Sequence, residues 1–154
     1  MTPQDIGTTG VRVSPLAFGC ASIGNLYRAT TDAKAQAVLH SAWAAGLRYF
    51  DTAPHYGRGL SEMRLGSFLA DHPDVVVSTK VGRVLSPAKQ PIAEADGFVA
   101  PAQNGVRYDY SGDGIEESFE QSCQRLGRDR IDILYVHDLG EYTHGAEQFD
   151  ALFA

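Results

Sequence analysis

Short apolar runs alternate with amphipathic segments along this chain, and that alternation restricts the fold more than any other feature. The runs are four to six residues long, and stretches with helical spacing of apolar side chains separate them. Near-continuous apolar strands joined by helices are typical of parallel sheets covered on both faces. The sequence therefore predicts an α/β fold with parallel strands at 16–19, 47–50, 75–79 and 131–136.

The first helix is predicted to begin after Thr31. Either Thr31 or Asp32 can cap its start, and Gly46 can close its end. Apolar residues recur in between at the spacing that forms one stripe on a helix. We expect this stripe to face the core, and it consists of Ala35, Val38, Leu39, Ala42 and Trp43.

Two further helices are predicted from similar signals. Ser61 can cap one helix, which Pro73 stops. Asp113, with Glu116 three residues later, forms a capping-box-like start of the other, which Gly127 closes. The side chains expected to be buried are Leu65, Phe68 and Leu69 in the first and Ile115, Phe119, Cys123 and Leu126 in the second.

The two ends of the chain carry shorter patterns. Thr8-Thr9-Gly10 indicates a turn between two short extended pieces, the second being Val11-Arg12-Val13. Phe149, Leu152 and Phe153 have the spacing of the first turns of another amphipathic helix.

Polar side chains stand where three of the predicted strands end. Asp51 directly follows the second run, and Tyr56 lies in the next loop. Lys80 follows the third run, and His137 follows the fourth. The carboxyl ends of parallel strands lie on one rim, and in (β/α) barrels that rim carries the chemistry. The sequence therefore predicts a catalytic site at this rim.

These residue types suit proton transfer to a carbonyl. A phenol, with an ordinary pKa of ~10, exchanges protons poorly at neutral pH, and a nearby ammonium favours its phenolate. Lys80 is placed to act on Tyr56 in this way, and Asp51 is placed to orient Lys80. His137 can hydrogen-bond a carbonyl oxygen. Such a set suits hydride transfer in which a cofactor provides the hydride and the protein provides the proton.

Each of the four residues has a plainer role when it is taken alone. Asp51 could cap a loop, and Tyr56 could be a half-buried loop aromatic. Lys80 could extend from the strand end into solvent, and His137 could be a structural histidine. Their joint placement at one rim favours the catalytic interpretation.

The connection over residues 82–112 is longer than a compact βα loop. Its prolines and glycines argue against a helix, and its aromatic and β-branched residues argue against disorder. They are Pro87, Pro91, Gly97, Pro101, Gly105 and Gly112, and Phe98, Val99, Val106, Tyr108 and Tyr110. Because the segment begins two residues after Lys80, we expect a lid or pocket wall, with a solvated insertion as the alternative.

Composition disfavours several classes of partner. The 13 basic and 19 acidic residues give a net charge of −6, which argues against nucleic acid or an anionic membrane. No apolar run can span a bilayer, and the N-terminus lacks a signal-peptide pattern. Cys20, Cys123 and the histidines show no metal-ligand spacing, and dinucleotide (Rossmann), P-loop and serine-hydrolase motifs are missing. We expect a cytoplasmic enzyme without a metal.

Several segments resemble the aldo-keto reductases. They are Gly19-Cys20-Ala21, Phe50-Asp51-Thr52-Ala53-Pro54-His55-Tyr56-Gly57, Gly59-Leu60-Ser61-Glu62, Ser78-Thr79-Lys80 and Asp132-Ile133-Leu134-Tyr135-Val136-His137. The Asp-x-x-x-x-Tyr-Gly stretch with the later lysine and histidine is a specific signature. Asp109-Tyr110-Ser111 and the residues after Val136 look most like the branch that acts on aldoses, such as fucose or threo-aldoses, or on pyridoxal.

The resemblance implies a (β/α)8 barrel of the TIM type, of which residues 1–154 would form about the first four βα units as one domain. It implies an NAD(P)-dependent interconversion of a carbonyl and an alcohol on a small carbonyl or sugar substrate. Tyr56 would be the acid/base, Lys80 and Asp51 would tune it, and His137 would orient the substrate. The residues implied near the nicotinamide of NADP or NAD are Gly19, Cys20, Ala21 and Asp51, although a buried structural thiol is the plainer role for Cys20.

The resemblance covers the first half of a typical family member. In the family, most contacts to the adenosine phosphates come from the second half of the barrel. A four-stranded half-barrel exposes sheet edges and part of its core. We therefore expect a truncated form of a full enzyme, a half-barrel that pairs with itself, or one that pairs with another chain. The alternative function is a catalytically inactive binding or regulatory subunit.

Overall fold

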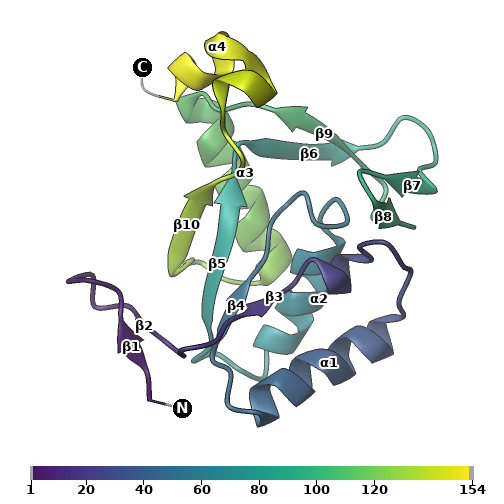
Figure 1. Ribbon diagram of the computed structural model, residues 1–154. Helices are drawn as coiled ribbons and strands as arrows, with labels where there is room; N and C mark the ends of the chain where they lie inside the picture. The colour runs from purple at the N-terminus through teal and green to yellow at the C-terminus, as the bar shows by residue number, and fades with distance from the viewer. Residues whose placement is uncertain (1, 153–154) are drawn as a thin grey trace.

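A parallel sheet forms the centre of the protein. The computed structural model describes residues 2–152, without the side chains of residues 141–144 and 148. The four strands lie in the order β10-β5-β4-β3, and each neighbouring pair is parallel. They are β3 (Phe18–Gly19), β4 (Tyr49–Asp51), β5 (Val76–Val81) and β10 (Ile133–Val136). The predicted α/β fold is confirmed, and this sheet corresponds to part of a (β/α)8 barrel (Figure 1).

The first helix, α1 (Asp32–Ala44), begins as the sequence predicts. The side chain of its N-cap, Thr31, accepts a hydrogen bond from a backbone N–H in the first turn. The predicted stripe is too wide, because only Ala35 and Leu39 are buried, whereas Val38 and Trp43 are 40% and 37% exposed. The helix packs mainly on the next helix, so only a narrow face is covered.

The second helix, α2 (Leu60–Leu69), begins two residues earlier than a cap at Ser61 would place it. Its N-cap is Gly59, whose φ of 99° favours glycine. Ser61 instead lies buried inside the helix, and its hydroxyl donates to the carbonyl of Cys20 at 2.8 Å. The three predicted core residues of this helix, Leu65, Phe68 and Leu69, are buried.

The third long helix, α3 (Gly112–Leu126), differs from the prediction in its cap and its buried face. The cap is Ser111 rather than Asp113. The buried residues are Gly114, Ser118, Ser122 and Leu126, so only Leu126 of the predicted apolar stripe is fully buried. These small residues allow the helix to approach β5, β6 and α2 closely, which a stripe of large side chains would prevent.

The segment 82–112 folds into two β-ribbons before α3 begins. In one ribbon β6 (Arg83–Pro87) pairs antiparallel with β9 (Asn104–Tyr108), and in the other β7 (Glu94–Ala95) pairs with β8 (Phe98–Val99). Figure 1 shows both beyond the carboxyl end of β5. The smaller ribbon docks on the segment around η1 (Ser22–Gly24), since Val99 donates to the carbonyl of Asn25. As predicted, the connection is ordered without a helix of its own.

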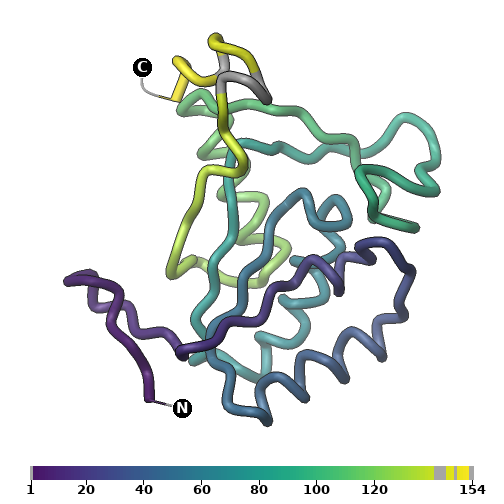
Figure 2. The backbone as a smooth tube through the Cα atoms, viewed as in Figure 1, coloured from purple at the N-terminus to yellow at the C-terminus, as the bar shows by residue number. Residues whose placement is uncertain are grey.

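The two ends of the chain lie at opposite ends of the sheet (Figure 2). The predicted N-terminal hairpin is present as β1 (Gln4–Asp5) and β2 (Arg12–Val13). The C-terminal helix, α4 (Glu141–Ala151), includes Phe149, and Leu152 follows it, whereas Phe153 lies outside the described residues. No helix in the described part of the chain is long and apolar enough to cross a membrane.

Candidate active site

A lysine–aspartate pair occupies the carboxyl ends of β4 and β5. Asp51 is the register partner of Ser78, and alternate residues of a strand share a face, so Ser78 and Lys80 both lie beside Asp51. Lys80 Nζ donates to Asp51 Oδ2 at 2.8 Å and to the carbonyl oxygen of Thr52 at 2.8 Å. Ser78 Oγ donates to Asp51 Oδ1 at 2.6 Å. Both carboxylate oxygens are therefore fixed, and the ammonium has a defined position.

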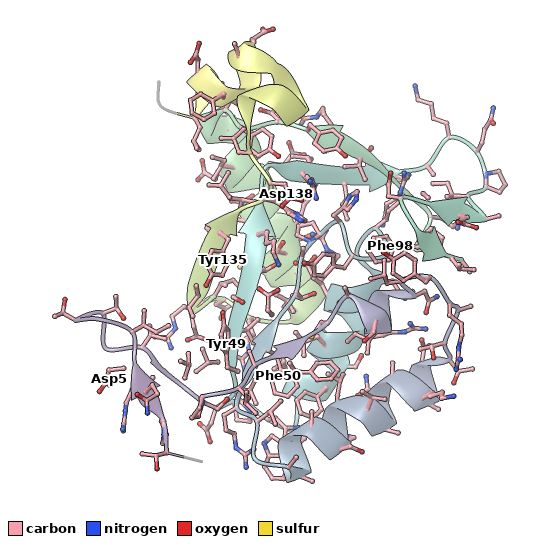
Figure 3. All side chains as sticks on the ribbon, viewed as in Figure 1. Asp5, Tyr49, Phe50, Phe98, Tyr135 and Asp138 are labelled. Carbon is pink, nitrogen blue, oxygen red and sulfur yellow. The ribbon has the colours of Figure 1, made fainter. Side chains whose placement is uncertain are left out.

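A chain of hydroxyl groups extends from this pair across the sheet. The hydroxyl of Tyr49 donates to Ser78 Oγ at 3.0 Å, and Ser78 in turn donates to Asp51. Burial raises the pKa of Tyr49 to about 12, so this phenol stays protonated and keeps its role as a donor. Figure 3 shows Tyr49 together with Tyr135 over the strands of the sheet.

Tyr56 lies in the turn between β4 and α2, directly beside the lysine. Lys80 Nζ stands 4.6 Å from the centroid of the Tyr56 ring. The turn is held by close backbone packing, because a Cβ at Gly57 would lie 2.3 Å from the carbonyl oxygen of Gly24. Gly57 also has a φ of 63°, which favours glycine. Gly57 therefore allows the tight turn that places Tyr56 beside Lys80.

His137 follows β10 and faces the same tyrosine. Its ring centroid lies 5.8 Å from that of Tyr56, and the two rings are nearly perpendicular at 89°. Its backbone N–H donates to the carbonyl of Val81, and its own carbonyl accepts from the Tyr110 hydroxyl at 2.6 Å. The structure thus brings all four predicted catalytic residues to one rim.

The imidazole of His137 is buried and neutral. His137 is 4% exposed. One terminal nitrogen of Arg83 lies 2.8 Å from Nδ1 and 2.9 Å from Nε2 of its ring. Burial, followed by the positive charge of Arg83, lowers the pKa of His137 well below its ordinary value of 6.5. Burial and the same arginine also lower the pKa of the neighbouring His55.

The residues expected near a nicotinamide lie at the end of β3. Gly19 is exposed, and a Cβ built there meets no heavy atom within 4 Å, so space is open beside Asp51. The Cys20 thiol is fully buried in the core cluster, which agrees with its plainer structural role, and burial raises its pKa. Ala21 is half-buried and precedes η1. The chain offers backbone and open space here rather than a reactive thiol.

Four residues of the site were missed from the sequence. Ser78 and Thr52 contact the lysine–aspartate pair, and the two-residue period of a strand, counted back from Lys80, is a signal that would have found Ser78. Arg83 and Tyr110 belong to the 82–112 connection, whose path the sequence does not reveal. The described residues contain no cluster that could hold a metal ion.

Comparison with known proteins identifies the family. Residues 15–153 match the sequence profile of the Aldo/keto reductase family. The chain belongs to this family. It is 48% identical over 143 residues to D-threo-aldose 1-dehydrogenase of a Pseudomonas species, an alignment that covers 89% of this chain and 44% of the relative. It is 42% identical over 149 residues to pyridoxal 4-dehydrogenase of Microbacterium luteolum, covering 90% and 44%.

Solved structures show the same relationship. The holo form of an aldo-keto reductase from Bacillus halodurans matches with a TM-score of 0.71 at 28% identity, over 98% of this chain and 45% of that chain. A family member from Pseudomonas aeruginosa matches with a TM-score of 0.69 at 31% identity, over 98% and 53%. The chain thus spans about half the length of these aldo-keto reductases.

Proposed function

We propose that the protein is an NAD(P)-dependent oxidoreductase that interconverts a carbonyl and an alcohol. The observation that carries this proposal is the position of Lys80, which is paired with Asp51 at 2.8 Å and lies 4.6 Å from the Tyr56 ring centroid. A phenol beside a fixed ammonium is suited to exchanging a proton with a substrate oxygen. Family membership supports the same reaction class.

Each residue has a distinct part in this proposal. Tyr56 takes the hydroxyl proton during alcohol oxidation and returns a proton to the oxygen during carbonyl reduction. Lys80, held by Asp51, stabilises the phenolate form between these steps. His137 donates a hydrogen bond to the same substrate oxygen and so directs it towards Tyr56. A bound nicotinamide cofactor supplies or accepts the hydride.

The residues available to a nicotinamide are those beside Asp51. A Cβ at Gly19 would meet no heavy atom within 4 Å, so the carboxyl ends of β3 and β4 leave open space on which a flat ring could lie. Gly19 and Ala21 would contact it through their backbone, and Asp51 would line it. The proposal includes both NAD and NADP, because these residues would contact only the nicotinamide, which the two cofactors share.

The proposed substrate is an aldose or a similarly small aldehyde or hemiacetal. The two relatives reported above are dehydrogenases of a D-threo-aldose and of pyridoxal, which are both small polar molecules. Phe98 supports a restricted site, because its ring lies 6.1 Å from Tyr56 and 6.0 Å from His55, centroid to centroid. The 82–112 segment would then serve as a pocket wall.

The experiment is a substrate screen on the wild-type chain and on Tyr56→Phe. Aldoses and pyridoxal are offered with NAD⁺ and with NADP⁺, and nicotinamide absorbance reports turnover. We expect Tyr56→Phe to lower kcat by about 10²- to 10⁴-fold, because it removes the proton-transfer group and keeps the ring. Tyr27→Phe, at an 82% exposed residue, is the matched control. Equal kcat for Tyr56→Phe and wild type would refute the mechanism.

A second candidate is a non-catalytic binding subunit. Leu134, Tyr135 and Val136 of β10 are 44%, 47% and 39% exposed, and such a strand favours contact with a second copy of this chain. Light scattering and a fluorescence titration with NADPH separate the candidates. Self-association without NADPH binding or turnover favours the subunit, whereas a dispersed monomer removes the reason for it.

A further inference from the structure

The guanidinium of Arg83 contacts the imidazole of His137 from the base of the 82–112 segment. The side chain of Arg83 is only 6% exposed, and its terminal nitrogen lies within 2.9 Å of both ring nitrogens. We propose that Arg83 is a positioning residue that holds the His137 imidazole in its neutral form, the form that can donate a hydrogen bond to a substrate oxygen. The catalytic consequence of this inference rests on the proposed function.

The chemistry of the two side chains carries the inference. A guanidinium has five N–H donors and no acceptor, so it binds only a ring nitrogen that lacks a proton. In a neutral imidazole one nitrogen accepts and the other donates. The Arg83 nitrogen lies 2.8 Å from Nδ1 and 2.9 Å from Nε2, so it can donate to whichever of the two accepts, and the ring then carries a single N–H. An imidazolium there would place two cations in contact, which the fold disfavours.

Stability alone does not explain this arginine. Its Nε lies buried without a hydrogen-bond partner, and a buried unsatisfied donor costs free energy. A hydrophobic residue would avoid that cost, although it would also lose the ion pair with Asp138 at 3.3 Å and the contact with the Tyr108 ring at 5.3 Å. The guanidinium is therefore placed in spite of its energetic penalty, as expected of a residue that serves a site.

The surrounding backbone fixes the position of Arg83 closely. Gly82, with a φ of 97°, lies against the Tyr110 ring, and a Cβ there would meet that ring at 2.2 Å. The carbonyl of Arg83 accepts from Ser118 Oγ of α3 at 3.2 Å. Tyr110 in turn donates to the carbonyl of His137. The same segment therefore holds both the ring and the backbone of the histidine.

The other charged groups around His137 either raise or lower its pKa. Lys80 from β5 and His55 from the β4–α2 turn disfavour its protonation, as Arg83 does. Asp138 opposes them, since its Oδ2 lies 3.5 Å from Nε2 of His137 and 3.3 Å from Arg83. The Asp138 side chain is 72% exposed, so solvent weakens its influence. Arg83 is therefore the nearest charge that keeps this ring neutral.

The test is an NMR titration of the histidine rings in the full chain. His137 is assigned by loss of its signal in His137→Gln, and its midpoint is compared in wild type, Arg83→Met and Arg83→Lys. We expect the wild-type ring to stay neutral well below pH 6.5, and Arg83→Met to raise the midpoint by about one to three pH units. Arg83→Lys keeps the charge and should raise it less. Arg107→Met, on the paired strand β9, is the matched control and should leave it unchanged.

Two results would overturn the inference. One is an unchanged His137 midpoint in a folded Arg83→Met variant. The other is a wild-type His137 that protonates close to pH 6.5, a result that needs no folded Arg83 variant. Because the titration requires no turnover, it stands even where the proposed reaction fails. Where turnover is found, we expect Arg83→Met to lower kcat/KM at acidic pH more than at neutral pH, since protonation then removes the neutral donor.

Discussion

Strands β5 and β10 lie side by side in parallel register, yet their surroundings differ. Val77, Ser78 and Thr79 of β5 are 0% exposed, whereas three consecutive residues of β10 are 39–47% exposed. Each strand ends in a proposed catalytic residue, Lys80 on β5 and His137 after β10. The site is therefore assembled from one strand inside the core and one strand at the open edge of the described sheet.

The difference shows two ways of fixing a site residue. Lys80 is positioned by the sheet itself, through Asp51 and the carbonyl of Thr52 on the neighbouring chain segment. His137 follows an exposed strand, and besides its backbone bond to Val81 it is held by Arg83 and Tyr110 of the 82–112 segment. The 82–112 segment therefore positions the residue that follows β10, whereas the core positions the residue on β5.

The largest expected effect tests the core strand. Val77→Ala should lower the free energy of unfolding by about 2 kcal/mol, because it removes two fully buried methyl groups. Val136→Ala, the same change on β10, should cost about 0.5 kcal/mol or less. Urea unfolding of both variants measures the contrast. Equal losses would show that β10 is covered in solution and would break the comparison.

A smaller change in the free energy of unfolding is expected when the pH is lowered. This change tests the state of His137, which follows β10. The pKa of His137 is below its ordinary value in the folded protein, so between those two values the unfolded chain binds more protons. The free energy of unfolding should therefore fall as pH drops below 6.5, by at most about 1.4 kcal/mol per pH unit from this residue. His55 contributes with the same sign.

Urea unfolding from about pH 7 to about pH 5 measures this slope in wild type and in His137→Gln. The variant should lose a large part of the slope, because it has no imidazole to protonate. His40→Gln, at an exposed residue of α1 whose ring borders Phe68 and His72, is the control for removing a histidine elsewhere. An identical slope in His137→Gln would contradict a neutral, buried His137.

The smallest expected effect concerns the Tyr110 hydroxyl. Tyr110→Phe removes a buried donor to the carbonyl of His137 and should lower the free energy of unfolding by about 1 kcal/mol. The loss of amide-exchange protection should be confined to the end of β10 and to Asp138. Tyr27→Phe, at an 82% exposed residue, should change neither the protection nor the free energy of unfolding. A global loss of protection, extending to β5, would mean that the two strands are not supported separately.

Much of the proposed site follows from local patterns. The polar residues after apolar runs identified Asp51, Lys80 and His137, because parallel strands bring their carboxyl ends together whatever the helices do. Tyr56 followed from its place in the adjoining loop. The interior of α3 was harder, because its buried face uses Ser118 and Ser122, and small polar residues carry no apolar period.

The sequence by itself determined the family, the parallel direction of the strands and the four residues proposed for catalysis, since these depend on motifs and spacing along the chain. Only the tertiary structure decided how His137 is held. Arg83 and Tyr110 stand 54 and 27 positions away from it in the sequence, and their contact with it arises from the path of the β6–β9 ribbon. These contacts depend on the close packing of Gly82 against the Tyr110 ring and on the turn of the chain there. A periodic pattern of apolar residues does not predict either feature.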